Sequence, residues 1–402
     1  MKSALLTLLL VLAAMPAGAQ HGGTVESRYG IGEIKSMTTA RHRGMGGAGL
    51  ALPSNYDISL SNPASWTSLD QLRLEMGLSF EHLSFSSDAS SVSNGAVDGF
   101  QLVIPLSEAW RFRLATGLLP LSRSSYKASG VDYLDEERYT VQYEGSGGIS
   151  QFRVGAAVEP VDGISIGAAY QYYFGTIEQS WELAFDNTQY FDSRQRRATN
   201  HNGSGLLLGL NARLPWGVTL AAAVSPKTSL NAARNMVFEY STEDSTVSGA
   251  TATQTLPTEL SLGLSWQATN TVLFALDYRT RDWTGAEIFD GKQSELTNSY
   301  NLNAGVEWMP FKEDIGSRTL SRTAFRLGFS LHQPYITLQG KDVQEYHITT
   351  GAGFPIFAGS RADVAFSWGR RTEESPLYGT GSIIRLSMTV SVGESWFIRH
   401  RD

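Results

Sequence analysis

Residues 100–120 read FQLVIPLSEAWRFRLATGLLP, and the pattern of this stretch decides the fold. Large apolar residues stand at every second position on both sides of Ser107-Glu108, and most positions between them are polar, charged or small. A period of two sends successive side chains to opposite faces of a β-strand. The stretch therefore predicts two antiparallel strands, each with one apolar and one polar face, joined by a tight turn. The apolar positions are Phe100, Leu102, Ile104, Leu106, Trp110, Phe112, Leu114 and Leu118.

The same alternation returns along most of the chain and marks an even number of segments. The links between them are short at one set of ends, with a longer exception at 309–322, and long and polar at the other, as in 121–137, 179–204 and 227–256. Sorted loop lengths are typical of an outer-membrane barrel, whereas the alternative, a soluble β-sandwich, has shorter strands and unsorted loops. We expect an all-β fold, a fourteen-stranded antiparallel transmembrane β-barrel over residues 71–397. The segments are 72–85, 97–106, 109–120, 138–158, 164–178, 205–214, 217–226, 257–266, 271–282, 298–308, 323–331, 345–354, 361–369 and 382–393.

The tryptophans fall near the ends of these segments. Amphipathic rings prefer the two interfaces of a membrane, so their placement predicts two girdles around the barrel. The girdle at the short turns takes Trp110, Trp216, Trp266, Trp308 and Trp396, and the girdle at the long loops takes Trp181, Trp283 and Trp368.

The two ends of the chain indicate export to the bacterial outer membrane. Lys2, an apolar run over 4–14 and the small residues before Gln20 predict a signal peptide over residues 1–19, cleaved near Ala19. Many barrels end in a terminal aromatic that the barrel-assembly machinery reads, whereas here Trp396-Phe397 is followed by five more residues. Either the signal is internal, or residues 398–402 form a periplasmic tail, which is the assignment we adopt.

Composition excludes several classes of protein. The chain of 402 residues has no cysteine, which excludes disulfides, thiolate metal sites and a cysteine nucleophile. Its net charge of −7, without a basic cluster, gives no case for nucleic-acid binding. We expect a monomer with no cofactor and no metal.

Residues 20–70 do not alternate like the rest and are rich in glycine, so we expect them to fold inside the barrel as a plug. The spacing Gly44-x-Gly46-x-x-Gly49 resembles a dinucleotide-binding loop, but such a loop needs a buried strand before it and a helix after it. The preceding SMTTARH is not a buried strand, and Pro53 stands where the helix would run. We interpret Gly44, Gly46, Gly47 and Gly49 as positions where the plug backbone packs closely.

The stretch RGMGGAGLALPSNYDISLSNPASW, residues 43–66, resembles the hatch of FadL-type outer-membrane transporters, which carry long-chain fatty acids or aromatic hydrocarbons. The match to the hatch motif is Asn62-Pro63-Ala64, and residues 256–285 resemble a strand pair of the same family. The resemblance implies a fourteen-stranded barrel with an N-terminal hatch over 20–70. It also implies passive transport of a hydrophobic compound, with lateral release into the bilayer at a kinked third strand. We expect the motif to pack near that strand.

The third strand ends with Gly117 and Pro120, and proline removes a hydrogen bond from a strand ladder. These two residues are the candidates for the lateral opening, with an ordinary strand end as the alternative. Arg111, Arg113 and Arg153 are candidates for binding a ligand carboxylate, and lumen ion pairs are the alternative for each. The other polar residues expected to face the lumen are Asn211, Arg213, Asp277, Arg279, Glu307, Arg326, Asp363 and Arg385.

Two other classes of function stay open. An outer-membrane hydrolase needs a histidine beside a serine or aspartate, and His332 and His347, which flank one outer loop, have no convincing partner in the sequence. We therefore expect no catalytic residues and no enzyme activity. A PorV-like secretion component that carries exported protein cargo is the second alternative. The expected partners are a hydrophobic small molecule, outer-membrane lipids and the barrel-assembly machinery.

Overall fold

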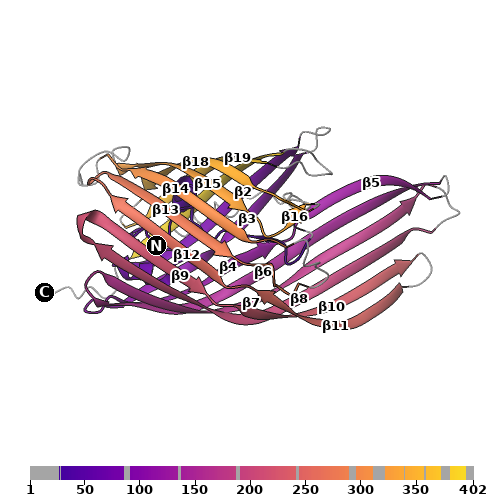
Figure 1. Cartoon of the computed structure of the whole chain (residues 1–402), viewed down its shortest axis with the longest axis horizontal. Helices are drawn as coiled ribbons and strands as arrows, with labels where there is room; N and C mark the ends of the chain where they lie inside the picture. The colour runs from indigo at the N-terminus through magenta and orange to yellow at the C-terminus, as the bar shows by residue number, and fades with distance from the viewer. Residues whose placement is uncertain are drawn as a thin grey trace.

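In the computed structural model, fourteen antiparallel strands close into one barrel, as expected (Figure 1). The structure describes residues 27, 29–85, 91–134, 137–186, 191–240, 244–288, 296–310, 322–338, 340–356, 359–372 and 381–394. The expected signal peptide and the expected C-terminal tail lie outside these residues. The strands in ring order, with β20 pairing back to β2, are β2 (Leu72–Phe85), β3 (Ser91–Ser107), β4 (Phe112–Arg123) with β5 (Tyr126–Leu134), β6 (Glu137–Val161), β7 (Ile164–Phe185), β8 (Ser193–Leu214), β9 (Val218–Ser225) with β10 (Thr228–Tyr240), β11 (Asp244–Leu256) with β12 (Glu259–Gln267), β13 (Val272–Arg281), β14 (Ser299–Trp308), β15 (Ala324–Gln333), β18 (Glu345–Pro355), β19 (Arg361–Arg371) and β20 (Gly381–Glu394).

Three of the fourteen strands are each built from two segments. β4 and β5 both pair with β6, β9 and β10 both pair with β8, and β11 and β12 pair with β10 and β9. The interruptions at Pro226 and Pro257 are explained by the missing N–H of proline. Minor elements are the 3₁₀ turn η3 (Pro215–Gly217) and a small hairpin of β16 (Thr337–Leu338) and β17 (Lys341–Asp342).

The alternation of side chains produces an apolar exterior and a polar interior. In β12, Leu260, Leu262 and Leu264 are exposed on the outside, whereas Ser261 and Ser265 are buried inside. The same division recurs around the ring, and the exterior therefore carries a continuous apolar surface of the kind that contacts lipid. Within the described parts of the chain, every helix is too short or too polar to cross a bilayer.

Four tryptophans of the short-turn girdle, at positions 110, 216, 266 and 308, are exposed as expected, and so is Trp368 at the other end. The expectation for Trp283 is wrong, because this ring is fully buried and stacks on Tyr335 at 4.3 Å between centroids. Trp181 lies beyond the barrel beneath the guanidinium of Arg197, and Trp396 is outside the described residues.

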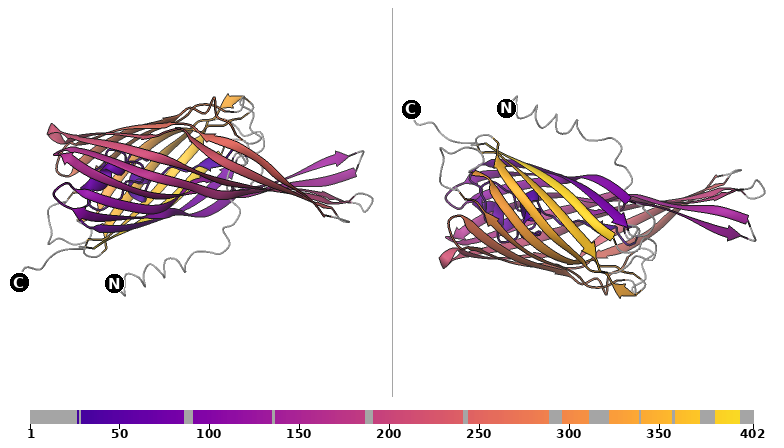
Figure 2. Two further views of the ribbon diagram at one scale, coloured as in Figure 1. Left: turned by 90° about the horizontal axis from the view of Figure 1, so that it is seen from below. Right: turned by 90° about the horizontal axis from the view of Figure 1, so that it is seen from above.

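Much of the three long links 121–137, 179–204 and 227–256 forms strands, and their prediction as loops is wrong. These residues build a six-stranded sheet in the order β5-β6-β7-β8-β10-β11, which projects beyond the barrel (Figure 2). Both faces of this sheet are largely polar, so the alternation of large apolar residues that marked the barrel strands is missing there.

The segment before β2 packs against the inner surface of the barrel, within the ring of strands in Figure 2. It contains β1 (Glu33–Ile34), which pairs with β4, and two short helices, α2 (Ala40–Gly44) and η2 (Pro63–Ser68). Thr39 caps α2 by accepting from the His42 N–H, and Asn62 caps η2 by accepting from the Ala64 N–H. Asparagine followed by proline is a strong helix start, because the proline needs no hydrogen-bond acceptor at the first position.

The glycines of this segment lie where backbone meets backbone. Gly46, at φ +71°, is so close to the carbonyl oxygens of Phe329 and Ala304 that a side chain would overlap them. Gly44 packs closely on the backbone of Gly351 in β18, where a Cβ would lie 3.0 Å from the Gly351 Cα. Gly47, also at positive φ, packs on the side chain of Asn303, and a side chain at Gly49 would overlap the His42 ring. The glycine spacing therefore serves close packing in the lumen.

Candidate functional site

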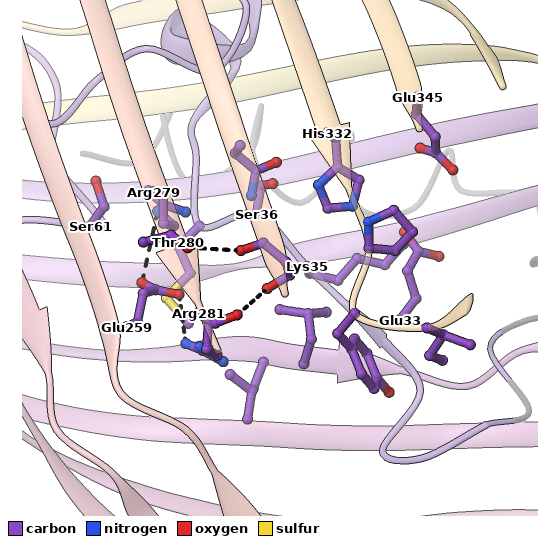
Figure 3. A pocket seen from close by; sticks show the side chains of 18 of the residues that line it. Glu33, Lys35, Ser36, Ser61, Glu259, Arg279, Thr280, Arg281, His332 and Glu345 are labelled. Carbon is purple, nitrogen blue, oxygen red and sulfur yellow. Dashed lines mark hydrogen bonds and ion pairs between the residues drawn. The ribbon is translucent and has the colours of Figure 1, made fainter. Parts of the chain in front are cut away.

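A cavity of about 110 Å³ lies between the N-terminal segment and the barrel wall, toward the long-loop end (Figure 3). β1 and the residues beside it form one wall, and side chains of β2, β7, β13, β14 and β20 form much of the rest. The accessible surface of the lining is more apolar than polar. Its apolar members are Ile34, Met37, Leu60, Leu83, Leu121, Tyr173, Leu207, Trp283, Tyr335, Ile336, Val343 and Ile383.

Tyr335 joins the outer loops to the N-terminal segment at one side of this cavity. Its hydroxyl donates to the Gly32 carbonyl at 2.7 Å and accepts from the Ile31 N–H at 3.2 Å. Burial raises the pKa of the Tyr335 phenol, so the group stays neutral and keeps its proton for Gly32. With Trp283 stacked on its ring, Tyr335 closes the cavity on the long-loop side.

Most charged groups around the cavity already have partners. Glu259 lies 2.6 Å from Arg281 and 3.8 Å from Arg279, as the dashed lines in Figure 3 mark. Lys35 and Glu33 are 2.8 Å apart on the N-terminal segment. On the opposite side, Glu345 pairs with Arg371 at 2.6 Å and Glu81 pairs with Arg385. The polar rim is therefore close to neutral where these pairs form.

Arg153 of β6 differs from its neighbours, because it lines the cavity without an ion pair to any described carboxylate. It is buried, and its Nη1 donates to the Leu60 carbonyl at 2.5 Å. Its Nη2 meets the Met37 sulfur at 3.2 Å, and its Nε has no hydrogen-bond partner. A buried charge without a counterion is costly, so an anion bound in the cavity would be stabilised here.

The structure does not bring Arg111 and Arg113 to this cavity. Arg111 sits in the turn between β3 and β4 at φ 44° and faces Glu159 at 3.8 Å. Arg113 is fully buried near the same turn, where it donates to the Leu69 carbonyl at 2.6 Å and to Glu108 at 3.1 Å. Both side chains are engaged at the short-turn end, as the ion-pair alternative expects.

The barrel wall is divided between β3 and β4. Their pairing runs from Ser107 opposite Phe112 to Phe100 opposite Leu118 and goes no further. Beyond that point β3 continues only with β2, and β4 continues with β6 and with β1 of the N-terminal segment. Gly117 is one residue before the end of the shared ladder, and Pro120 lies just past it at a bulge against β6.

A second cavity, of about 120 Å³, reaches this division of the wall. Val97, Asp98, Pro120 and Arg123 line it on the wall side. It borders the first cavity, because both are lined by residues 33–36 of the N-terminal segment and by Glu81, Arg279, Asn301, His332, Glu345 and Arg385. The Arg123 guanidinium crosses the division and donates to the Gly95 carbonyl at 3.4 Å.

The hatch motif makes its closest contacts with β7 and β8, and the 3₁₀ turn η2 that contains Pro63 and Ala64 also contacts β6 and the third strand, β4. The Asn62 Nδ2 is 2.6 Å from the Asn211 Oδ1 of β8 and also donates to the Leu50 carbonyl at 3.2 Å. Pro63 lies directly against Gly167 of β7 and Gly209 of β8. Gly209 leaves space for the Pro63 ring and the Asn62 side chain, and Gly167 leaves space for the backbone between Pro63 and Ala64. Ala64, with 0 % of its surface exposed, completes the buried motif.

His347 has polar neighbours that the sequence did not reveal. Its Nδ1 is 3.3 Å from the Ser367 hydroxyl, and its Nε2 is 3.6 Å from Glu345. The expectation that this histidine lacks a serine partner is therefore wrong. Glu345, however, already accepts two hydrogen bonds from Arg371, and the three residues form part of the paired lumen network.

A fourteen-stranded barrel whose N-terminal segment packs inside the ring defines a FadL-type fold, and solved structures of low sequence identity share it. A FadL homologue of Pseudomonas aeruginosa aligns with a TM-score of 0.62 at 13% identity, covering 90% of this chain and 99% of the other. The toluene transporter TbuX of Ralstonia pickettii gives 0.58 at 16% identity, covering 88% and 98%. The toluene transporter TodX of Pseudomonas putida gives 0.57 at 17% identity, covering 90% and 99%.

The chain belongs to the BamG family, whose model matches residues 1–401. No curated protein matches the sequence.

Proposed function

We propose that the protein lies in the bacterial outer membrane and passes a hydrophobic small molecule with a carboxylate, similar to a long-chain fatty acid, to a lateral exit between β3 and β4. The observation that carries this proposal is Arg153, a buried guanidinium without an ion pair, at the edge of an apolar cavity. Apolar walls suit an alkyl chain, and the unpaired arginine suits a carboxylate. The division into a signal peptide (1–19), hatch (20–70), barrel (71–397) and periplasmic tail (398–402) is part of the same proposal.

The apolar exterior supports the location. Exposed leucines, phenylalanines and tryptophans surround the ring, and a soluble protein would aggregate through such a surface. The sheet closes into a ring, as lipid requires, and its strand ladders are continuous except where β3 and β4 separate beyond Phe100 and Leu118. The solved neighbours include proteins described as toluene transporters, which supports a hydrophobic ligand.

The path follows the two cavities. A ligand in the first cavity reaches the second by displacing residues 33–36, which border both. From there the open ladder between β3 and β4 leads to the outside of the barrel beside Val97 and Pro120. β1 pairs with β4 beyond the point where the ladder between β3 and β4 ends. Movement of β1 away from β4 would therefore widen the exit.

Binding of a long-chain fatty acid and of its methyl ester to the purified protein tests the role of Arg153. A charge-assisted hydrogen bond contributes about 1.5–3 kcal/mol, so Arg153→Gln should weaken binding of the acid about ten- to a hundredfold and leave the ester almost unchanged. Arg138→Gln, which removes an exposed pair with Asp186 on the projecting sheet, is the control. Equal loss for acid and ester would contradict the assignment. In cells without their own fatty-acid channel, uptake that never exceeds the empty vector would contradict transport.

A role with a protein partner is the second candidate, as in PorV-like carriers of protein cargo. The projecting six-stranded sheet favours it, because β5 and β11 each pair with one neighbour among the described strands and leave a backbone edge open. The family name BamG is in line with a barrel-assembly context. A photocrosslinking residue at Thr251 of β11 should capture a specific protein in cells, whereas the same residue at exposed Trp216 should not. Identical products at both positions would count against this role.

A further inference from the structure

A separate and larger cavity, of about 880 Å³, opens at the short-turn end of the barrel. Its walls come from the turns between barrel strands and from residues 53–57 and 68–73 of the chain before and within the start of β2. Among the described residues it shares no lining residue with the ligand cavity or with the cavity at the wall opening. This vestibule therefore lies on the other side of the N-terminal segment from the proposed transport path.

The side chains that line the vestibule include more arginines than carboxylates, in a protein that is negative overall. Seven arginines line it against three carboxylates, Asp57, Asp70 and Glu307, whereas the whole chain carries a net charge of −7. Four more carboxylates lie behind the lining: Glu159 and Asp162 beside Arg213, Asp363 beside Arg361, and Glu75, which interacts electrostatically with Arg73. The excess of arginines is therefore confined to the side chains that face the cavity.

Arg41 and Arg326 have more guanidinium N–H groups than the carboxylates beside them can accept. Glu307 accepts from Arg41 at 2.9 Å and from Arg326 at 2.7 Å, and Asp363 accepts from Arg326 at 2.6 Å. As a result the Arg41 Nη1 and the Arg326 Nη2 are buried without a hydrogen-bond partner. The nearest carboxylate oxygen to the Arg41 Nη1 is on Asp57 at 3.9 Å, beyond hydrogen-bond reach.

Arg73 of β2 adds a third unsatisfied guanidinium. It is 1 % exposed and donates to the Gly359 carbonyl at 3.1 Å and the Ser391 hydroxyl at 3.0 Å. Its Nε has no hydrogen-bond partner, and it forms no ion pair with a described carboxylate. Arg322 stands exposed and also lines the vestibule. Buried donors without acceptors are rare because each costs free energy, unless a ligand supplies the acceptor.

We propose that this vestibule is a binding site for a small oxyanion, a molecule that carries carboxylate or phosphate groups. Guanidinium groups bind both kinds of anion through two parallel hydrogen bonds, and a concave site lined by cations raises the local concentration of anions. The volume suits a small molecule with several charged groups, which can reach Arg41, Arg73 and Arg326 together. The site is independent of the proposed transport of a hydrophobic ligand.

Calorimetric titration of the purified full-length mature protein in detergent with citrate and with pyrophosphate tests the proposal. We expect saturable binding at low salt that weakens as sodium chloride is added. Binding of citrate alone assigns a carboxylate ligand, and binding of pyrophosphate alone assigns a phosphate. Saturable binding of neither anion would overturn the proposal.

Variants locate the binding. Arg73→Gln should weaken it about tenfold or more, and Arg322→Gln, at an exposed position, should weaken it without affecting assembly. Arg138→Gln on the projecting sheet and Arg153→Gln in the ligand cavity should bind both anions like the unchanged protein, which separates this site from the transport path. If Arg73→Gln does not assemble into a heat-modifiable barrel, Arg322→Gln decides. Unchanged affinity in the assembled variants would overturn the proposal.

Discussion

Arg43 of α2 donates a 2.7 Å hydrogen bond to Asp98, the one residue of β3 that bulges out of its ladder with β2. Asp98 lines the cavity at the divided wall, and it also accepts from the Ser79 hydroxyl at 2.8 Å. Arg43 donates in addition to the Ser387 hydroxyl of β20 at 2.8 Å. The N-terminal segment is therefore tied to β3 at the place where β3 and β4 separate.

Breaking this tie should make lateral release easier. Asp98→Asn removes the charge that holds Arg43, and we expect uptake of a fatty acid to rise severalfold because the bulge and the segment then move independently. Arg43→Gln should have the same effect, and the double variant should add little to either single change. Uptake that falls in both single variants would show that the pair supports the path itself. Arg138→Gln, at a distant exposed pair, is the control.

The placement of the hatch motif predicts a specific crosslink. Thr67 of η2 donates from its hydroxyl to that of Ser165 on β7, with 2.8 Å between the oxygens. The natural chain has no cysteine, so Thr67→Cys with Ser165→Cys should form one disulfide on oxidation and change the gel mobility of the unreduced protein. Each single cysteine variant is the control. Absence of the bond in the folded barrel would contradict packing of η2 against β7.

Gly46 should tolerate a methyl group poorly. It has φ +71°, and a Cβ there would overlap backbone oxygens of β14 and β15. The left-handed conformation costs a non-glycine residue about 1–2 kcal/mol, and overpacking adds about 1–3 kcal/mol. Gly46→Ala should lower the temperature of the heat-induced mobility shift, while Gly130→Ala, where a Cβ meets open space, should not. Equal shifts for both would contradict the close packing.

The barrel was predictable because its signal is local and repeated. A strand such as β12 shows its lipid face as leucine at every second position, and this pattern needs no knowledge of the neighbours. The strands of the projecting sheet lack an alternation of large apolar residues. β11, for example, reads DSTVSGATATQTL, which is as typical of a polar loop as of a strand. Its strand state follows from pairing with β10, which is a tertiary effect.

The candidate site was predictable only in its residue types. The alternation predicted that the three candidate arginines, at 111, 113 and 153, face the lumen. Their height in the barrel depends on strand register, which the sequence does not show. Arg111 lies beside Glu159, and Arg113 beside Glu108 and the Leu69 carbonyl, both near a short turn. Trp283 looked like an interfacial ring, yet its loop folds inward over Tyr335. The separation of β3 from β4 was predictable from Gly117 and Pro120, because proline has no N–H to donate to a strand ladder.

Acid should loosen the N-terminal segment through Asp57. This carboxylate is buried, lies 2.8 Å from the His42 Nε2 and accepts from the Thr39 hydroxyl at 2.8 Å. Burial raises the pKa of Asp57, but the His42 and Arg41 charges and the Thr39 hydrogen bond outweigh it, and the net pKa lies below the usual value of about 3.9. A carboxylate with a lowered pKa contributes stability that is fully present above the unfolded pKa and is lost as the pH falls through the folded one.

The expected window is therefore below about pH 4. Between pH 7 and pH 5 the contribution of Asp57 to stability should be constant. Below pH 4 the N-terminal segment of the unchanged protein should be cleaved faster than it is at pH 7. Asp57→Asn should be less stable at pH 7, because Arg41 loses a buried carboxylate at 3.9 Å, and its stability should depend less on acid. Asp186→Asn, at an exposed pair with Arg138, should keep the acid dependence of the unchanged protein. Limited proteolysis against pH for the three proteins measures this, and an Asp57→Asn profile parallel to that of the unchanged protein would assign the acid sensitivity to other carboxylates.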